Sequence, residues 1–340
     1  MVFELSNKRI LILLLQVTIS IVVLFLLFQG VNFGDTLEVF ALIDVPLFVS
    51  SILFFVFSSL TVGLALHTTL KSVGVNIPLS SSVSASYGGQ LLSDITPAKS
   101  GYFATSVLLH ELKQVSMEKG LMSVMAMGAV NFFIKAIFSA VSLIYFLNRI
   151  PPDIMDPSLA NALLFGIILL LIGGVGLTVL VWTNYMPSLI KKFSNIPYIG
   201  KLFRKLEPIL EIFNKDQSLL KKSIKKTSLL IISSIFIFTV GIFLLSNSVD
   251  MSQPSFIDLL FMGPLTAVFM YVPVTFAGLG LQEAAYVFLL TSIGALEPNA
   301  LAFALLVRIL FITTDLVGLP ALIKTGTGLV NVFDNKSKKD

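Results

Sequence analysis

The chain alternates between long apolar runs and short polar segments, and this pattern predicts its architecture. A helix needs about 20 mainly apolar residues to cross the hydrocarbon core of a bilayer. Runs close to that length occur at 10–28, 46–66, 121–147, 161–183, 228–246, 257–273 and 300–323. The ~10-residue alternating strands of a transmembrane barrel are not visible. The pattern therefore predicts an all-α, polytopic helical membrane protein.

The distribution of Lys and Arg predicts the orientation of these spans, because cytoplasmic loops collect basic residues. The segment 184–226 carries ten Lys and Arg against three acids, and Lys71, Lys113, Lys119 and the basic C-terminal tail fall on the same side. Counted in this way, 19 of the 23 bases lie inside, Arg149 lies outside and three bases lie within the membrane. We therefore expect both termini to be cytoplasmic.

This orientation constrains two less regular stretches, 80–112 and 274–296. The segment 79–113 must begin and end inside, so we expect a re-entrant helical hairpin broken at "SDITPAKSG" (93–101). The stretch 274–296 must cross outward or act as a half-span. The expected fold has about seven to eight transmembrane helices plus one re-entrant hairpin. Residues 1–328 form one integral membrane domain, followed by a short polar tail at 329–340.

Composition narrows the possible functions. The mean hydropathy is +0.94, and only 12% of the residues are charged, against about 25% in soluble domains. With no Cys and two His, the sequence predicts no disulfide and no Cys/His metal site. We expect no metal, no cofactor and no nucleic-acid partner, because topology explains the net charge of +4. Within 184–226, apolar residues recur at helical spacing beside bases. This pattern fits either a helix lying on an anionic leaflet or an ordinary cytoplasmic loop.

Six charged residues fall inside predicted membrane segments, where each costs about 2.5–3.5 kcal/mol even on the lenient insertion scale. They are Asp94, Lys99, Lys135, Glu283, Arg308 and Asp315. Three acids and three bases suggest mutual neutralisation, either as structural ion pairs or around a polar, substrate-binding cavity. Gly128 and Asn131 share a helix face with Lys135, and Arg308 and Asp315 are also on one face. Arg308 is always charged and needs a partner, namely Glu283, Asp315 or a substrate phosphate, of which we favour the phosphate.

Two Gly/Pro-containing breaks interrupt the apolar pattern, "YGGQLLSDITPAKSG" (87–101) and "PVTFAGLGLQE" (273–283). Irregular backbone at membrane depth is tolerated only where protein or a water-filled cavity satisfies its polar groups. Transporters place such breaks at the substrate site. Glu283 is then expected to cap the following short helix or to pair with Arg308. The backbone positions predicted to shape the breaks are Pro97, Gly101, Pro273, Gly278 and Gly280.

The motifs "PAKSG" (97–101) and "AGLGLQE" (277–283), followed by Arg308, resemble the lysylphosphatidylglycerol synthase transmembrane family. The resemblance covers nearly the whole chain and implies translocation of lipids or lipid-linked molecules between leaflets. Two positions depart from the usual pattern. Tyr102 stands where that family commonly has Glu, and Thr105 or Ser106 stands where it has Arg. The soluble aminoacyl-transfer domain of the full-length synthases is also missing, so we do not expect this chain to make lysyl-lipid.

The sequence contains no Walker loop, zinc-protease motif or nucleophile elbow, so we expect a transporter and not an enzyme. Any transport is then passive or coupled to an ion gradient, with Glu283 and Asp315 as candidate proton carriers. We favour a cell-membrane protein that flips anionic phospholipid or lipid-linked headgroups, with membrane lipids as its partners. Two alternatives remain, a small-solute or ion transporter, and a membrane partner of a lipid-modifying or glycosyl-transfer enzyme.

Overall fold

The computed structural model describes residues 7–30, 33–151, 154, 157–182, 200–271 and 274–326, and every regular element in these ranges is helical. Five helical segments are long and apolar enough to cross a membrane: Val45–Ser72, Met117–Arg149, Ala160–Val179, Ser218–Ser248 and Glu297–Gly326. A sixth crossing results if α1 (Asn7–Gly30) and α2 (Phe33–Ala41), bent by 87° where they meet, form one span. The chain is thus a helical membrane protein, and its described residues hold five or six candidate spans in place of the seven to eight expected.

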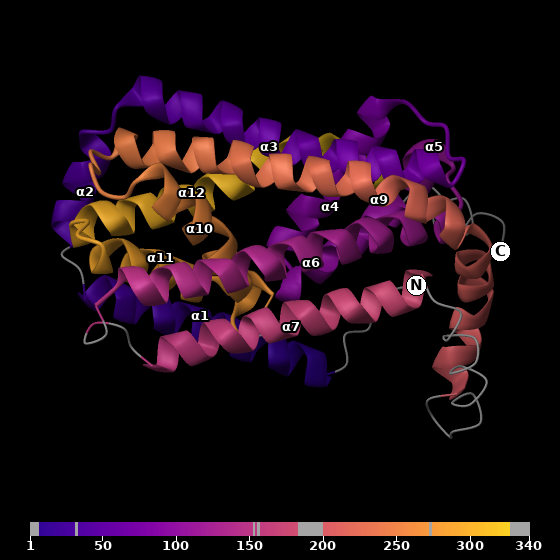
Figure 1. The fold of residues 1–340 in the computed structure, drawn as a ribbon, viewed down its shortest axis with the longest axis horizontal. Coiled ribbons are helices and arrows are strands. Elements are labelled where there is room, and N and C mark those ends of the chain that lie inside the picture. Colours follow the sequence, from indigo (N-terminus) through magenta and orange to yellow (C-terminus); the bar gives the residue numbers. More distant parts are fainter. Residues whose placement is uncertain are drawn as a thin grey trace, which may run out of the picture.

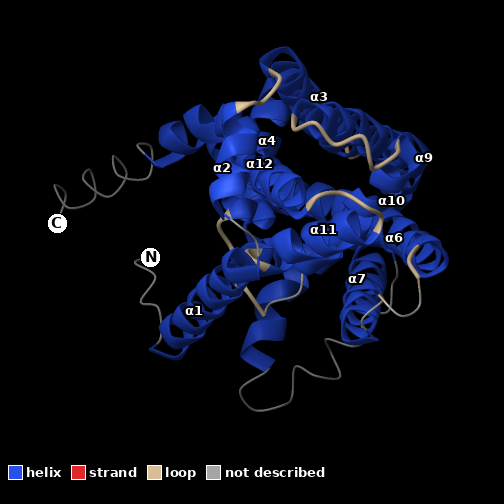
Figure 2. Ribbon diagram, turned by 90° about the vertical axis from the view of Figure 1, so that its left-hand side faces the viewer, coloured by secondary structure: helices blue, strands red, loops and turns tan. Residues whose placement is uncertain are grey.

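The long helices run roughly parallel to the long axis of the molecule (Figure 1). They are α3 (Val45–Ser72), α6 (Met117–Arg149), α7 (Pro157–Trp182), α9 (Gly200–Ser248) and α12 (Glu297–Asp315). Helix α3 packs along α9, and α6 packs along α7. Helices α4, α11 and α12 lie between the α3–α9 pair and α1 (Figure 2).

The α3–α9 pair is antiparallel. The Ser58 hydroxyl donates to the Ser234 carbonyl at 2.9 Å, and the Asp44 N–H donates to the Ser248 carbonyl at the same distance. Close approach is possible because Gly241 faces Phe54 and Phe55, where a Cβ would already lie 3.0–3.1 Å from those rings and side chains. Small residues at such contacts let helices pack where lipid supplies no hydrophobic drive. The start of α3 and the end of α9 therefore lie at one end of the bundle.

The predicted hairpin at 79–113 enters and leaves the bundle at the same end. Lys119, just after the hairpin, donates to the carbonyl of Val73, just before it, at 3.1 Å. Between them the chain forms α4 (Leu79–Asp94), the 3₁₀ helix η1 (Pro97–Ala104) and α5 (Thr105–Lys113). Both η1 and α5 pack back on α4. The break falls where the sequence predicted it.

A second hairpin enters from the opposite end, and here the expectation of a full span at 257–273 is wrong. Helix α10 (Phe256–Ala267) continues only through the 3₁₀ helix η2 (Val268–Met270), and the chain returns through η3 (Phe276–Gly278) and α11 (Leu281–Ser292). The Asn299 side chain donates to the Val249 carbonyl at 2.7 Å, so the segment between them leaves and rejoins the same end. A helix of 12 residues is about 18 Å long, too short for the ~30 Å core.

Hydropathy overestimated the number of spans because apolar side chains can be buried by protein as well as by lipid. Met262, Leu265 and Val268 of the second hairpin are fully buried inside the bundle. The stretch 274–296, expected to cross or to act as a half-span, is the returning arm of this hairpin. The tips of the two hairpins meet in the interior, where η1 contacts both η2 and η3.

Parts of the expected cytoplasmic segment and tail lie outside the described residues. Of 184–226, residues 200–226 form the beginning of α9, whereas 184–199 are not described. After α12 the chain continues through η4 (Leu316–Gly318) and a helical stretch at 319–326. The predicted tail at 329–340 lies beyond the described part of the chain.

Candidate functional site

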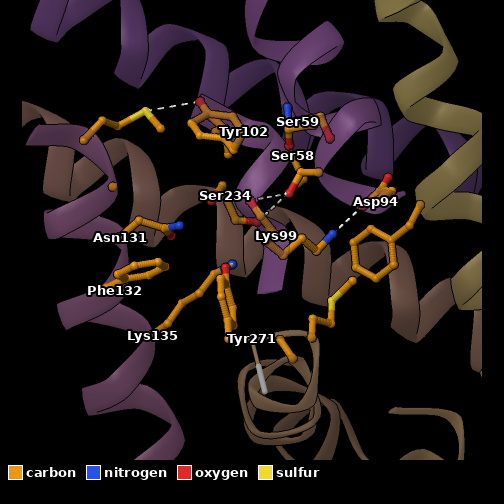
Figure 3. A pocket seen from close by; sticks show the side chains of 18 of the residues that line it. Ser58, Ser59, Asp94, Lys99, Tyr102, Asn131, Phe132, Lys135, Ser234 and Tyr271 are labelled. Carbon is orange, nitrogen blue, oxygen red and sulfur yellow. Dashed lines mark hydrogen bonds and ion pairs between the residues drawn. The ribbon is translucent and has the colours of Figure 1, made fainter. Parts of the chain in front are cut away.

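A cavity of about 220 Å³ lies between the two hairpin tips and the long helices (Figure 3). Its walls include Ser58 and Ser59 of α3, Asn131, Phe132 and Lys135 of α6, and Ser234 of α9. Each of these positions is close to the middle of its membrane-length helix. The cavity therefore sits at half-depth of the spans, where transporters with broken helices bind substrate.

The first hairpin tip supplies two opposite charges to this cavity. Lys99 forms an ion pair with Asp94, which ends α4. Lys99 has a left-handed backbone with φ of 57°, a conformation uncommon for a residue with a Cβ. The tip is held by side chain–backbone bonds, with the Gly101 N–H donating to Thr96 at 2.7 Å and Ser93 donating to the Lys99 carbonyl at 3.2 Å.

Gly101 is required by this tip for steric reasons. A Cβ at this position would lie 2.3 Å from the Leu92 carbonyl oxygen, well inside contact distance. Pro97 begins η1 directly after the extended Thr96, consistent with the restriction that proline imposes on the residue before it. Pro97 and Gly101 thus shape the break as predicted.

Lys135 reaches the cavity from α6, together with Gly128 and Asn131 on the same face. Its ammonium group donates to the Tyr271 hydroxyl at 3.0 Å and lies 5.4 Å from the centre of that ring. Tyr271 in turn packs edge-on against Phe132. The partner of Lys135 is neutral, so its positive charge is not cancelled by a contacting carboxylate among the described residues.

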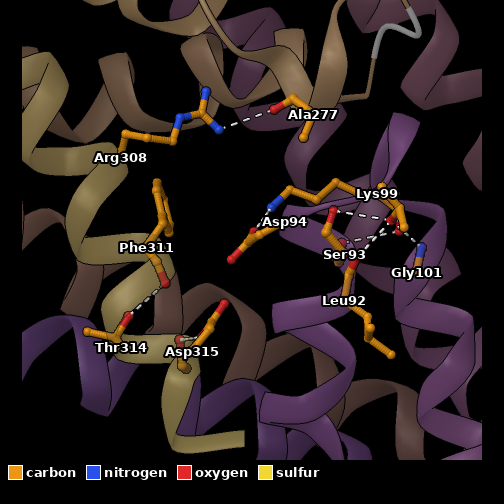
Figure 4. Close-up of polar contacts among 12 residues, drawn as sticks. Leu92, Ser93, Asp94, Lys99, Gly101, Ala277, Arg308, Phe311, Thr314 and Asp315 are labelled. Atoms are coloured by element: carbon orange, nitrogen blue, oxygen red, sulfur yellow. Dashed lines mark hydrogen bonds and ion pairs between the residues drawn. The ribbon is translucent and has the colours of Figure 1, made fainter. Parts of the chain in front are cut away.

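Asp315, at the end of α12, brings a second carboxyl group to Asp94. Ser59 donates to Asp315 at 3.3 Å. Figure 4 shows the Asp94 and Asp315 carboxyl groups turned toward each other. Four of the six predicted membrane charges, Asp94, Lys99, Lys135 and Asp315, therefore line one cavity.

The other two charges form a separate pair. Arg308 binds Glu283 with a distance of 2.5 Å between Nε and Oε1, and it donates from Nη1 to the Ala277 carbonyl at 3.2 Å. Glu283 also accepts the Gly280 N–H at 2.7 Å, which caps the N-terminus of α11. The cap and the pair with Arg308 were expected as alternatives for Glu283, and the structure shows both. The partner of Arg308 in this structure is Glu283, in place of the phosphate we favoured, and neither residue lines the cavity.

The glycines of the second break adopt conformations that a side chain would disfavour. Gly278 and Gly280 have φ of 76° and 86°. A Cβ on Gly278 would lie 2.9 Å from the Met270 Cα. Ala277 beside them also has a positive φ of 50°. Pro273, the remaining predicted backbone position, lies outside the described residues.

Several cavity residues were not singled out as site residues from the sequence. Ser58 and Ser59 form a polar pair at the middle of an apolar run, which is a signal that could have found them. Tyr271 and Tyr102 have aromatic rings that read equally well as core or lipid-facing groups, so no comparable signal exists for them. Gln90 also lines the cavity. In the sequence it follows Gly88 and Gly89 and precedes the break at 93–101.

The chemistry available in the cavity is charge recognition. Two ammonium groups can hold an anion, and two carboxyl groups can hold a proton or balance the lysines. In the part of the chain that the structure describes, no three His, Cys, Asp or Glu side chains come together as metal ligands.

Comparison with known proteins agrees with this architecture. No curated protein sequence matches the chain. A family profile described as the lysylphosphatidylglycerol synthase TM region matches residues 13–317, which include both hairpins and every cavity-lining residue. The chain therefore belongs to the family of lysylphosphatidylglycerol synthase transmembrane regions.

Proposed function

We propose that this protein translocates anionic phospholipid or lipid-linked headgroups between the two leaflets through its central cavity. The observation that carries the proposal is the pair of lysines, Lys99 and Lys135, which line one cavity at half-depth of the spans. Lysine is a compact point charge that binds phosphate oxygens. A bilayer interior offers little else that stabilises a phosphate.

The size of the cavity suits a headgroup and not a whole lipid. Its volume of about 220 Å³ corresponds to about seven waters at their liquid volume. The acyl chains then have to remain in the bilayer. Phe103 of η1 lines the cavity and is 41% exposed. We infer that the lipid enters the cavity past this side chain.

The orientation follows from the charges at the two ends of the bundle. Lys71 and Lys119 lie at the end of the bundle where α6 begins. Lys226 lies at the same end, close enough to His67 for an electrostatic interaction. The opposite end holds Asp44, Asp250 and Glu297. We place the lysine-rich end and both termini in the cytoplasm by the positive-inside rule, and the protein in the cell membrane.

The direct test is lipid exchange in proteoliposomes. Purified protein is reconstituted with trace fluorescent phosphatidylglycerol, phosphatidylethanolamine or phosphatidylcholine, and an impermeant quencher reports movement between leaflets. We expect the phosphatidylglycerol probe to move faster than in empty vesicles and faster than the zwitterionic probes. No exchange above empty vesicles across the panel would refute lipid translocation.

The cavity volume also admits a small anionic solute, so the same vesicles provide the test of that alternative. Uptake of radiolabelled phosphate or a short-chain organic anion without any lipid movement would favour a solute transporter. If the protein moves neither lipids nor small anions, the better explanation is the remaining alternative, a membrane partner of a lipid-modifying enzyme.

A further inference from the structure

Asp94 and Asp315 form a buried pair of carboxyl groups from two distant parts of the chain. Asp94 ends the first arm of one hairpin and Asp315 ends α12. They are 8% and 4% exposed. Both line the same cavity, and Figure 4 shows their carboxyl groups turned toward each other. Two carboxyl groups can share a hydrogen bond only if one of them carries a proton.

The groups around the pair do not supply enough positive charge for two carboxylates. Lys99 bonds one oxygen of Asp94, while the other oxygen, Oδ2, is buried and has no conventional donor among the described residues. Asp315 accepts a hydrogen bond from the Ser59 hydroxyl. The other titratable side chains facing Asp315 are the phenols of Tyr87 on α4 and Tyr102 on η1. With both acids ionised, Asp94, Asp315 and Lys99 would hold two negative charges against one positive charge. The other lysine of the cavity, Lys135, donates to the Tyr271 hydroxyl instead.

Two adjacent carboxylates in a buried site do not both ionise, because repulsion and loss of hydration both oppose the second charge. One shared proton makes the Asp94–Asp315–Lys99 cluster neutral. It also satisfies the unpartnered oxygen of Asp94. The proton belongs to the pair and not to either residue.

We propose that Asp94 and Asp315 form a proton-binding site that couples the proposed headgroup translocation to proton movement. This inference rests on the proposed function. When a headgroup phosphate binds Lys99, the Lys99–Asp94 bond is replaced by a bond from Lys99 to a phosphate oxygen. Asp94 then loses its cation and takes up one proton from cavity water. No covalent bond of the lipid changes, and one monoanionic phosphate travels with one proton.

The first test detects the proton without any transport. Infrared spectra of the protein in nanodiscs at neutral pH should show the C=O stretch of a buried protonated carboxyl group that resists hydrogen–deuterium exchange. Asp94→Asn and Asp315→Asn should each remove this band, because the remaining acid can ionise beside Lys99. Asp250→Asn is the matched control, since Asp250 is exposed and has a φ of 53° that asparagine tolerates. Identical spectra for wild type and both cavity variants would overturn the shared proton.

The second test measures proton uptake on binding. When short-chain phosphatidylglycerol is added to weakly buffered protein, each protein molecule should take up about one proton. A pH indicator measures this uptake. Phosphatidylcholine should cause no uptake, and neither should phosphatidylglycerol with the Asp94→Asn/Asp315→Asn double variant, which has no acid left at the pair. Equal proton uptake by wild type and the double variant would contradict the assignment to this pair.

The third test concerns coupling in proteoliposomes. Electroneutral movement of one anionic lipid with one proton means that a difference of one pH unit should distribute the labelled phosphatidylglycerol about tenfold toward the alkaline side. A potassium diffusion potential should not change this distribution, and a sodium gradient should not replace the pH gradient. The Asp94→Asn/Asp315→Asn double variant should exchange lipid to an even distribution whatever the pH gradient. Vesicles that show the infrared band but no lipid movement would refute the translocation proposal alone, whereas exchange that ignores the pH gradient would refute the coupling.

Discussion

Both hairpins contain a break and a charged residue in the sequence, but their charges have different roles in the structure. Each has a first arm, which is serine-rich in α4 and apolar in α10, then a break with positive φ and a short returning helix. The first tip presents Asp94 and Lys99 to the cavity, whereas the second keeps its charge, Glu283, in a pair with Arg308 outside the cavity lining. The second hairpin contributes to the cavity mainly apolar atoms and the Tyr271 phenol.

This difference separates two uses of a buried charge. At the second tip, Glu283 caps α11 and Arg308 ties the loop carbonyl of Ala277 to α12, so the pair fixes irregular backbone. At the first tip, backbone and hydroxyl groups fix the loop and leave the ion pair facing open space. The charges of the second tip therefore stabilise the fold, whereas the charges of the first tip line the cavity and are available to a ligand.

The largest expected effect is on stability at the second tip. Arg308→Ala should destabilise the protein by about 3–5 kcal/mol, because it leaves Glu283, which is 2% exposed, as an unpaired buried acid. Thermal unfolding in detergent measures the change. Adding Glu283→Gln to Arg308→Ala should recover part of the loss, since the unpaired charge is gone. A well-folded Arg308→Ala protein that has lost only lipid exchange would instead assign Arg308 to the substrate.

A smaller loss of stability is expected at the first tip. Gly101→Ala should destabilise by about 1–3 kcal/mol, the usual range for overpacking, because the added Cβ meets the Leu92 carbonyl oxygen at 2.3 Å. Gly176→Ala is the control, since a Cβ there has nothing within 4 Å and the residue lies in α7. It should be neutral or slightly stabilising. Equal unfolding temperatures for the two variants would show that the tip relaxes around the methyl group.

Lys135→Met should separate function from stability. Its polar partner is the neutral Tyr271 hydroxyl, so its removal leaves no unpaired acid and the unfolding temperature should stay near that of the wild type. Loss of a charge-assisted bond to phosphate, worth about 1.5–3 kcal/mol, should lower phosphatidylglycerol exchange roughly 10- to 100-fold. Lys119→Met, at the lysine-rich end, is the control. Unchanged exchange in Lys135→Met would exclude this lysine from headgroup binding.

Tyr271→Phe should produce the smallest effect. It removes the hydroxyl that accepts from Lys135 and keeps the ring beside the ammonium group. The expected loss of stability is about 1.5 kcal/mol, the lower end of the range for a hydrogen bond with a charged partner, because the ring still faces the ammonium group. Thermal unfolding of Tyr271→Phe beside Lys135→Met and the double variant gives the coupling between the two groups. Strictly additive effects would show that the 3.0 Å contact contributes nothing.

The sequence by itself determined the fold class, the position of the first break and the identity of the charges that need explanation. These features are local. Long apolar runs, Gly and Pro at a break, and a charge inside an apolar run each have a physical meaning within a window of about 20 residues. The cap on α11 by Glu283 is local for the same reason, since only three residues separate it from Gly280.

The tertiary structure alone decided which charges share a site and which apolar runs cross the membrane. Asp94 and Asp315 line one cavity although 221 positions separate them in the sequence. Helix periodicity on α12 placed Arg308 and Asp315 on one face without showing that only Asp315 would line the cavity. Hydropathy could not distinguish α10 and α11 from spanning helices, because Met262 and Leu289 are buried by protein and would read the same if buried by lipid. Only the long-range bonds from Lys119 to Val73 and from Asn299 to Val249 show that both hairpins return to the end at which they enter.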